Sequence, residues 1–129
     1  MTLSINTTEG DLVMIAIEQG RRVVAAKKFI AKYKQAEKLL PEVDKLLKNK
    51  KLSLARIKKI KVTNAGGSFT ALRIGVVTAN ALAYALGIPV QAVTKSSKKL
   101  QKVTRDFKRF NIVEPIYNRQ PNITTKKLR

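Results

Sequence analysis

The sequence contains neither cysteine nor histidine among its 129 residues, and it has only eight acidic residues. The lack of cysteine excludes disulfides, thiolate nucleophiles and thiolate metal sites, and it favours a reducing compartment. The lack of histidine excludes imidazole general bases, serine–histidine triads and the commonest zinc ligand. Because so few acid–base groups remain, we expect no catalytic residue, no cofactor and no metal site.

Membrane and leader signals are also missing. The first ten residues lack a basic region followed by an apolar one, and no apolar run approaches about 18 residues without polar breaks. We therefore expect a soluble, cytoplasmic protein without a membrane segment. The apolar share of 44% is ordinary for a globular protein, and 129 residues suit one compact domain.

Positive charge is abundant, since 27 Lys and Arg leave a formal net charge of +19. Such an excess raises the affinity for polyanions such as RNA, but a general solubility bias towards Lys has the same effect on composition. The densest basic stripe lies in residues 95–110, where the apolar spacing predicts a helix. This helix is either a phosphate-contacting surface or an ordinary surface helix. Its candidate RNA contacts are Lys98, Lys99, Lys102, Arg105, Lys108 and Arg109.

Hydrophobic periodicity predicts the order of the elements in the first half of the chain. Residues 3–5, 12–17 and 22–29 alternate as strands, with turns at 6–10 and 19–20, which predicts an antiparallel meander. The pattern then changes to helical spacing over residues 33–47. Pro41 lies inside this segment, so it either kinks the helix or begins a new one. Ser53 is expected to cap a short following helix.

A glycine turn joins a predicted strand at residues 60–63 to a long apolar helix at residues 69–86, with Ser68 as its cap. This geometry suits either an anion or close packing of the helix on the sheet. The helix is apolar nearly all round beyond its first turn, so both of its faces need a cover. The cover is either the core of the same domain or the surface of another protein. Residues 88–93 should form a strand parallel to the preceding one.

The glycine turn and helix start carry a resemblance. The stretch Gly-Gly-Ser-Phe-Thr-Ala-Leu-Arg-Ile-Gly at residues 66–75 resembles the signature of the TsaB (YeaZ) family, G-P-G-S-F-T-G-L-R-x-G. Residues 5–9, 39–41 and 115–119 are similar to that family's D-T-S-T-E, L-L-P and P-x-Y-x-R segments. The motif residues are Gly66, Gly67, Ser68, Phe69, Thr70, Leu72, Arg73 and Gly75.

The chain departs from the family pattern at several positions. Ala65, Gly66 and Ala71 stand where the motif has Gly, Pro and Gly. Asn6 stands where actin-like ATPases keep a metal-linked aspartate, and an amide is a poor substitute for a carboxylate in holding Mg²⁺. The chain is also short, as if most of a second lobe were missing between Val93 and Val113. A complete nucleotide cleft is therefore not expected.

The resemblance implies an α/β fold of the actin-like (ASKHA) class, with a mixed sheet of antiparallel meander and parallel strands, flanking helices and a truncated second lobe. We expect an actin-like lobe at residues 1–94, a basic helical segment at 95–112, and an extended segment and tail at 113–129.

The resemblance also implies a function. It predicts a non-catalytic scaffold in the formation of threonylcarbamoyladenosine in tRNA, which binds a TsaD-like catalytic subunit through its helices. A TsaE-like ATPase, a second copy of the chain and tRNA are further expected contacts. The expected interface residues are Leu39, Leu40, Val43, Leu47, Leu72, Arg73, Val76, Ala79 and Asn80. The alternative is a stand-alone basic RNA-binding module on an actin-like lobe.

Overall fold

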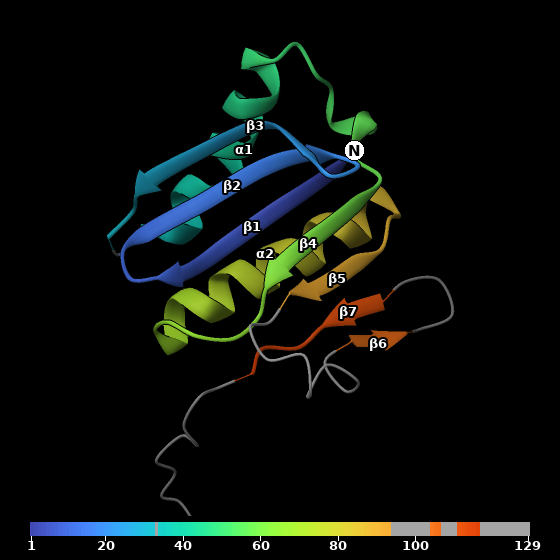
Figure 1. Ribbon diagram of the computed structural model, residues 1–129. Helices are drawn as coiled ribbons and strands as arrows, with labels where there is room; N and C mark the ends of the chain where they lie inside the picture. The colour runs from blue at the N-terminus through green and yellow to red at the C-terminus, as the bar shows by residue number, and fades with distance from the viewer. Residues whose placement is uncertain (33, 94–103, 107–110, 117–129) are drawn as a thin grey trace, which may run out of the picture.

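A five-stranded mixed sheet forms the centre of the molecule (Figure 1). The computed structural model describes residues 1–32, 34–93, 104–106 and 111–116. Strands β1 (Thr2–Glu9), β2 (Leu12–Gln19) and β3 (Arg22–Ile30) form an antiparallel meander. Strand β4 (Lys59–Thr63) pairs parallel with β1, and β5 (Val90–Val93) pairs parallel with β4. The strand order β3-β2-β1-β4-β5 confirms the predicted combination of a meander with parallel strands.

Two helices cover one face of this sheet (Figure 1). Helix α1 (Gln35–Asn49) packs on β2 and β3, whereas α2 (Phe69–Leu86) packs on β1 and β4 and also contacts α1. A short 3₁₀ helix, η1 (Leu54–Arg56), leads from α1 to β4. Ser53 precedes η1 as predicted, but its side chain makes no capping hydrogen bond.

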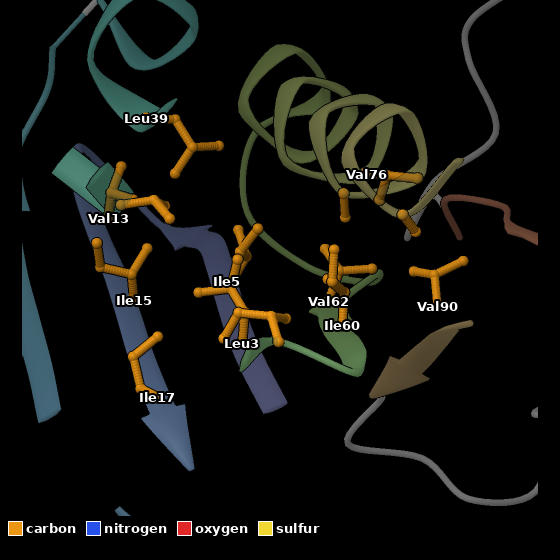
Figure 2. Packing of buried hydrophobic residues seen from close by; sticks show 14 of the residues in the cluster. Leu3, Ile5, Val13, Ile15, Ile17, Leu39, Ile60, Val62, Val76 and Val90 are labelled. Atoms are coloured by element: carbon orange, nitrogen blue, oxygen red, sulfur yellow. The ribbon is translucent and has the colours of Figure 1, made fainter. Parts of the chain in front are cut away.

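The core is built from the alternating residues of the strands. In Figure 2 the side chains of Leu3, Ile5, Ile15 and Ile17 point from β1 and β2 toward the helices. Leu39 from α1 and Val76 from α2 meet these strand residues, together with Ile60, Val62 and Val90 from β4 and β5. Each fully buried aliphatic side chain of this kind contributes about 1.5–3 kcal/mol of transfer free energy. Because only one face of the sheet is covered by helices, apolar and polar residues alternate along the strands with a period of two.

Strand β1 is longer than the sequence predicted, and the turn predicted at residues 6–10 is wrong at residues 6–9. The strand continues to Glu9 with a register shift after Asn6, and the chain reverses after it at Gly10, where φ is 67°. The Asn6 side-chain Oδ1 accepts hydrogen bonds from the Thr8 N–H at 2.8 Å and the Thr8 hydroxyl at 2.6 Å. These local bonds resemble those of an Asx turn, which explains why the composition indicated one.

Helix α1 runs through Pro41 without ending there. Its buried face consists of Gln35, Leu39, Val43, Leu46 and Leu47. The burial of these side chains against the sheet offsets the backbone hydrogen bond that a proline inside a helix removes. Beside this buried face, the Glu42 carboxylate accepts a hydrogen bond from Lys27 of β3, and this bond lowers the pKa of Glu42 below its ordinary value.

Helix α2 begins and ends where the sequence predicted. The Ser68 Oγ accepts a hydrogen bond from the Ala71 N–H at 3.1 Å, and Gly87 ends the helix in the left-handed conformation with φ 68°. By length and mean hydropathy, 1.4 over 18 residues, α2 also meets the criterion for a membrane span. A core helix meets the same criterion, and one face of α2 is buried on the sheet.

The described residues after β5 form a second small sheet. Strand β6 (Thr104–Asp106) pairs antiparallel with β7 (Asn111–Val113), which packs on β5 and α2 (Figure 1). The predicted helix at residues 95–110 is therefore wrong at residues 104–106, because pairing with β7 overrides the local helical pattern. Lys98, Lys99, Lys102, Lys108 and Arg109 lie outside the described residues, while Arg105 is in β6.

Candidate functional site

The glycine turn packs closely against the end of β1. Gly67 has φ 72°, and a Cβ at this position would lie 2.6 Å from the Thr8 carbonyl oxygen and 2.7 Å from the Thr8 Cα. Nearly two turns into α2, a Cβ on Gly75 would overlap the Thr7 hydroxyl oxygen and lie 3.0 Å from the Thr7 methyl group. Both glycines therefore allow strand and helix to approach more closely than any side chain permits.

A buried hydrogen bond holds this close approach together. The Thr7 hydroxyl donates to the Ala71 carbonyl oxygen at 2.6 Å, and the Thr7 side chain is 1% exposed. Of the two uses proposed for the glycine turn, close packing accounts for Gly67, because the space beside it is filled by the backbone of Thr8. The signature residues thus position α2 on the sheet.

Most of the expected interface residues lie in the core. Six of the nine have buried side chains that belong to the main hydrophobic cluster, so their burial is explained by the sheet and the other helix: Leu39, Val43, Leu47, Leu72, Val76 and Ala79. Their side chains are not on the surface of this chain, which corrects the expectation that they face a partner. Leu40 and Arg73 are exposed, and Asn80 is half-buried.

Asn80 fastens the C-terminal segment to α2. Its Nδ2 donates to the Val113 carbonyl oxygen at 2.8 Å, and its Oδ1 accepts from the Val113 N–H at 2.8 Å. Asn111 makes the same paired contact with the backbone of Val90, at 2.6 and 3.1 Å. Asn64, which is fully buried, donates to the Glu114 carbonyl oxygen at 2.9 Å.

The sequence did not predict the hydrogen bonds that Asn64, Asn80 and Asn111 make with the backbone of other segments. The only signal for it was that Asn80 is one of the few clearly polar positions in an otherwise apolar helix. A buried or half-buried amide in such a place needs hydrogen-bond partners, and here the backbone of β7 supplies them. The Asn80 side chain is therefore used within the chain.

Large apolar side chains remain exposed on the outer side of the helix pair. Leu40 of α1 is 48% exposed, and Phe69, Val77 and Tyr84 of α2 are 47%, 61% and 65% exposed. Residues 69, 73, 77 and 84 fall on one stripe of a helix, so Arg73, which is also exposed, lies among them. These five residues are called the helix-pair surface below.

A hollow lies on this surface between the two helices. Its volume is about 340 Å³, and it is lined by Ala36, Phe69, Thr70, Arg73, Ile74, Val77 and Thr78. The Arg73 guanidinium carbon lies 5.5 Å from the centroid of the Phe69 ring, which is within cation–π range. The hollow thus combines apolar walls with one positive charge.

The described parts of the chain offer little acid–base or metal chemistry. Within residues 1–32, 34–93, 104–106 and 111–116, no group of three or more Asp or Glu residues lies together as a metal site would require. The ion pairs found in the same ranges join Lys27 to Glu42, Lys48 to Asp44 and Lys61 to Glu18. These ion pairs lie outside the helix-pair surface, so the main feature of that surface is its exposed apolar side chains.

Comparisons with known proteins relate the chain to tRNA modification. The family model described as TsaD, tRNA N6-adenosine threonylcarbamoyltransferase, matches residues 29–107. The tRNA threonylcarbamoyladenosine biosynthesis protein TsaB of Buchnera aphidicola subsp. Schizaphis graminum is 32% identical over 76 residues, covering 59% of this chain and 36% of the relative. The TsaB protein of Bacillus subtilis is 29% identical over 119 residues, covering 92% of this chain and 50% of the relative.

The structural comparison agrees with the sequence comparisons. The solved structure of YeaZ from Pseudomonas aeruginosa superposes with a TM-score of 0.65 at 28% identity, covering 72% of this chain and 43% of that one. The chain spans half the length or less of these relatives. The YeaZ-like fold confirms the predicted class, and the comparisons do not favour the alternative of a stand-alone RNA-binding module. Since the family model matches more than half of the chain, the chain belongs to the TsaD family, and the members that it resembles are the TsaB (YeaZ) proteins.

Proposed function

We propose that this chain is a non-catalytic scaffold subunit in the biosynthesis of threonylcarbamoyladenosine in tRNA, and that it binds a TsaD-like catalytic subunit through the helix-pair surface. One observation carries the proposal. Helix α2 already buries one face on the sheet, yet Phe69, Val77 and Tyr84 on its other side remain about half exposed or more.

The composition of this surface supports a protein partner. Exposed aromatic residues and arginine are the residue types that contribute most binding energy at protein interfaces. Full burial of one large apolar side chain is worth about 1.5–3 kcal/mol, so several neighbouring ones supply a substantial driving force. Leu40 on α1 and Val77 on α2 extend the apolar area across both helices. A partner helix laid along this pair would cover residues of both.

Several features support a role without catalysis. The whole chain has no histidine and no cysteine, so the commonest general base and the thiolate nucleophile are both missing. The side-chain oxygen of Asn6 accepts two hydrogen bonds from Thr8. At the position where actin-like ATPases hold a metal, this chain therefore has a side chain that stabilises the local backbone. The catalytic residues of the modification reaction would then belong to the partner.

The proposal includes three further partners, which are a TsaE-like ATPase, tRNA and a second copy of the chain. A TsaE-like ATPase would bind the assembled complex, and the net charge of +19 would favour direct tRNA contact within that assembly. In the absence of the catalytic subunit, a second copy of the chain is the natural cover for the helix-pair surface. The complex would work in the cytoplasm, where tRNA is modified.

Calorimetric titration of the purified chain into the TsaD-like subunit of the same organism tests this proposal. Val77→Asp should weaken binding at least 100-fold, because it places a carboxylate in the apolar interface. Val23→Asp is the matched control, since Val23 lies on β3, away from the helix pair, and is 60% exposed against 61% for Val77. We expect Val23→Asp to bind like the wild type.

Three results would each overturn a part of the proposal. The scaffold role fails when the wild-type chain does not bind the catalytic subunit, or when Val77→Asp binds it as tightly as Val23→Asp does. The non-catalytic part fails when the purified chain alone hydrolyses ATP steadily and loses that activity on replacement of Asn6 or Ser68.

A further inference from the structure

The hollow between α1 and α2 has the size and lining of a receptor for apolar side chains. Its volume of about 340 Å³ leaves room for more than one of them. Most of its lining is apolar, from Ala36 on α1 and from Phe69, Ile74 and Val77 on α2. Water in such a place is readily displaced by an apolar group, and this displacement is favourable.

Arg73 gives the hollow its charge. The guanidinium is held over the Phe69 ring, with 5.5 Å between its carbon and the ring centroid, so the ring restrains it at the wall of the hollow. Arg73 takes part in none of the ion pairs found among the described residues, and the described lining of the hollow contains no carboxylate. The N–H groups of the Arg73 guanidinium are therefore available to a group on another molecule.

The position of Arg73 on α2 adds to the positive potential. Helix α2 starts at Phe69, so Arg73 lies just after the first turn, close to the positive end of the helix dipole. A cation is not stabilised by this end of a helix, whereas an anion brought beside it is attracted by both the dipole and the guanidinium. A carboxylate is the group that the arginine fork binds with two parallel hydrogen bonds.

We propose that the hollow receives apolar side chains from one helix of the partner, and that Arg73 pairs with a carboxylate about one turn away on the same helix. This inference rests on the proposed function and specifies the chemistry of the partner. An acidic helix is favoured over a second copy of the chain, because two copies of formal charge +19 repel each other. Arg73 would then determine which partner binds, and the apolar residues would supply most of the affinity.

The test uses charge-reversal variants of this 129-residue chain and the purified TsaD-like subunit of the same organism. Arg73→Glu should raise Kd about 10- to 100-fold at low ionic strength, and this loss of affinity should become smaller as the salt concentration is raised. Arg73→Lys should recover part of the affinity, because Lys keeps the charge but not the two-pronged geometry. Arg56→Glu in η1 is the matched control, since Arg56 is also exposed and the change in net charge is the same.

A rescue experiment identifies the carboxylate. Acidic residues on the partner's surface helices are replaced by Arg one at a time and paired with Arg73→Glu, and one of them should restore Kd to within about threefold of the wild type. Thermal unfolding of Arg73→Glu checks the fold, which we expect to be intact because an acidic residue suits this end of α2.

The outcomes separate the two proposals. If the wild type does not bind, the proposed function fails and this inference fails with it. If Val77→Asp abolishes binding but Arg73→Glu binds like Arg56→Glu, the surface is correct and the acidic partner helix is wrong. If Arg73→Glu dissociates a dimer of the chain alone but leaves the Kd for the catalytic subunit unchanged, Arg73 serves a second copy, and the inference is also overturned.

Discussion

Replacing Gly75 with alanine tests the close contact between β1 and α2. In an ordinary helix interior this change is stabilising by about 1 kcal/mol, because alanine has a higher helix propensity than glycine. At this position the added Cβ would overlap the Thr7 hydroxyl and lie 3.0 Å from the Thr7 methyl group and 3.3 Å from the Thr7 Cβ. We therefore expect Gly75→Ala to destabilise the protein.

The magnitude follows from what Thr7 must do to make room. Rotating its side chain breaks the 2.6 Å hydrogen bond to the Ala71 carbonyl and leaves a buried hydroxyl without a partner, which costs about 1–3 kcal/mol. Moving the strand instead creates overpacking of about 1–3 kcal/mol. These are alternative costs, so after the helix-propensity gain is subtracted the net loss should be up to about 2 kcal/mol, with about 1 kcal/mol as the central value.

Equilibrium unfolding in urea, followed by circular dichroism, measures this loss. The Thr7→Ala background provides the control, because it removes both the hydroxyl and the methyl group that the new Cβ would meet. In that background Gly75→Ala should be neutral or slightly stabilising, so the two changes should show a coupling energy of about 1–3 kcal/mol.

The reasoning is refuted by a Gly75→Ala variant that unfolds at the same urea concentration as the wild type, or at a higher one. An equal destabilisation in the wild-type and Thr7→Ala backgrounds would also refute it, since the cost would then have nothing to do with Thr7.

Two further predictions concern the glycine turn and the C-terminal segment. Gly67→Ala should destabilise the protein by about 1–3 kcal/mol more than Gly10→Ala in urea unfolding, because both glycines have φ near 70° but only Gly67 faces the Thr8 backbone. Equal losses for the two variants would contradict this. Asn80→Ala should speed hydrogen exchange at the Val113 amide about 10- to 100-fold, since the amide loses its acceptor, while exchange in the middle of β1 stays unchanged. An unchanged Val113 amide would show that Asn80 does not hold β7.

Local signals explain why α2 and the parallel strands could be predicted. Ser68 and Gly87 mark the ends of α2 by cap geometry that depends only on neighbouring residues. The β4-α2-β5 order leads to a parallel pair, because the helix carries the chain back to the end of the sheet where β4 began. The glycine motif also indicated the family, because its residue pattern is long and specific.

The predictions that failed depend on contacts between distant parts of the chain. The segment at residues 6–9 has the composition of a turn but forms strand, and Thr7 bonds to Ala71, which is 64 residues away. Asn80 bonds to Val113 across 33 residues. No local pattern reports such partners.

The helix-pair surface also depends partly on local sequence and partly on contacts between distant residues. The sequence by itself determined that α2 is a helix with more apolar surface than one sheet face can cover, because helix propensity, capping and composition are local properties. Only the tertiary structure decided which of its apolar residues are buried on the sheet and which remain outside. A helix that is apolar nearly all round carries almost no directional signal, so its orientation is determined by the close packing of Gly67 and Gly75 against β1.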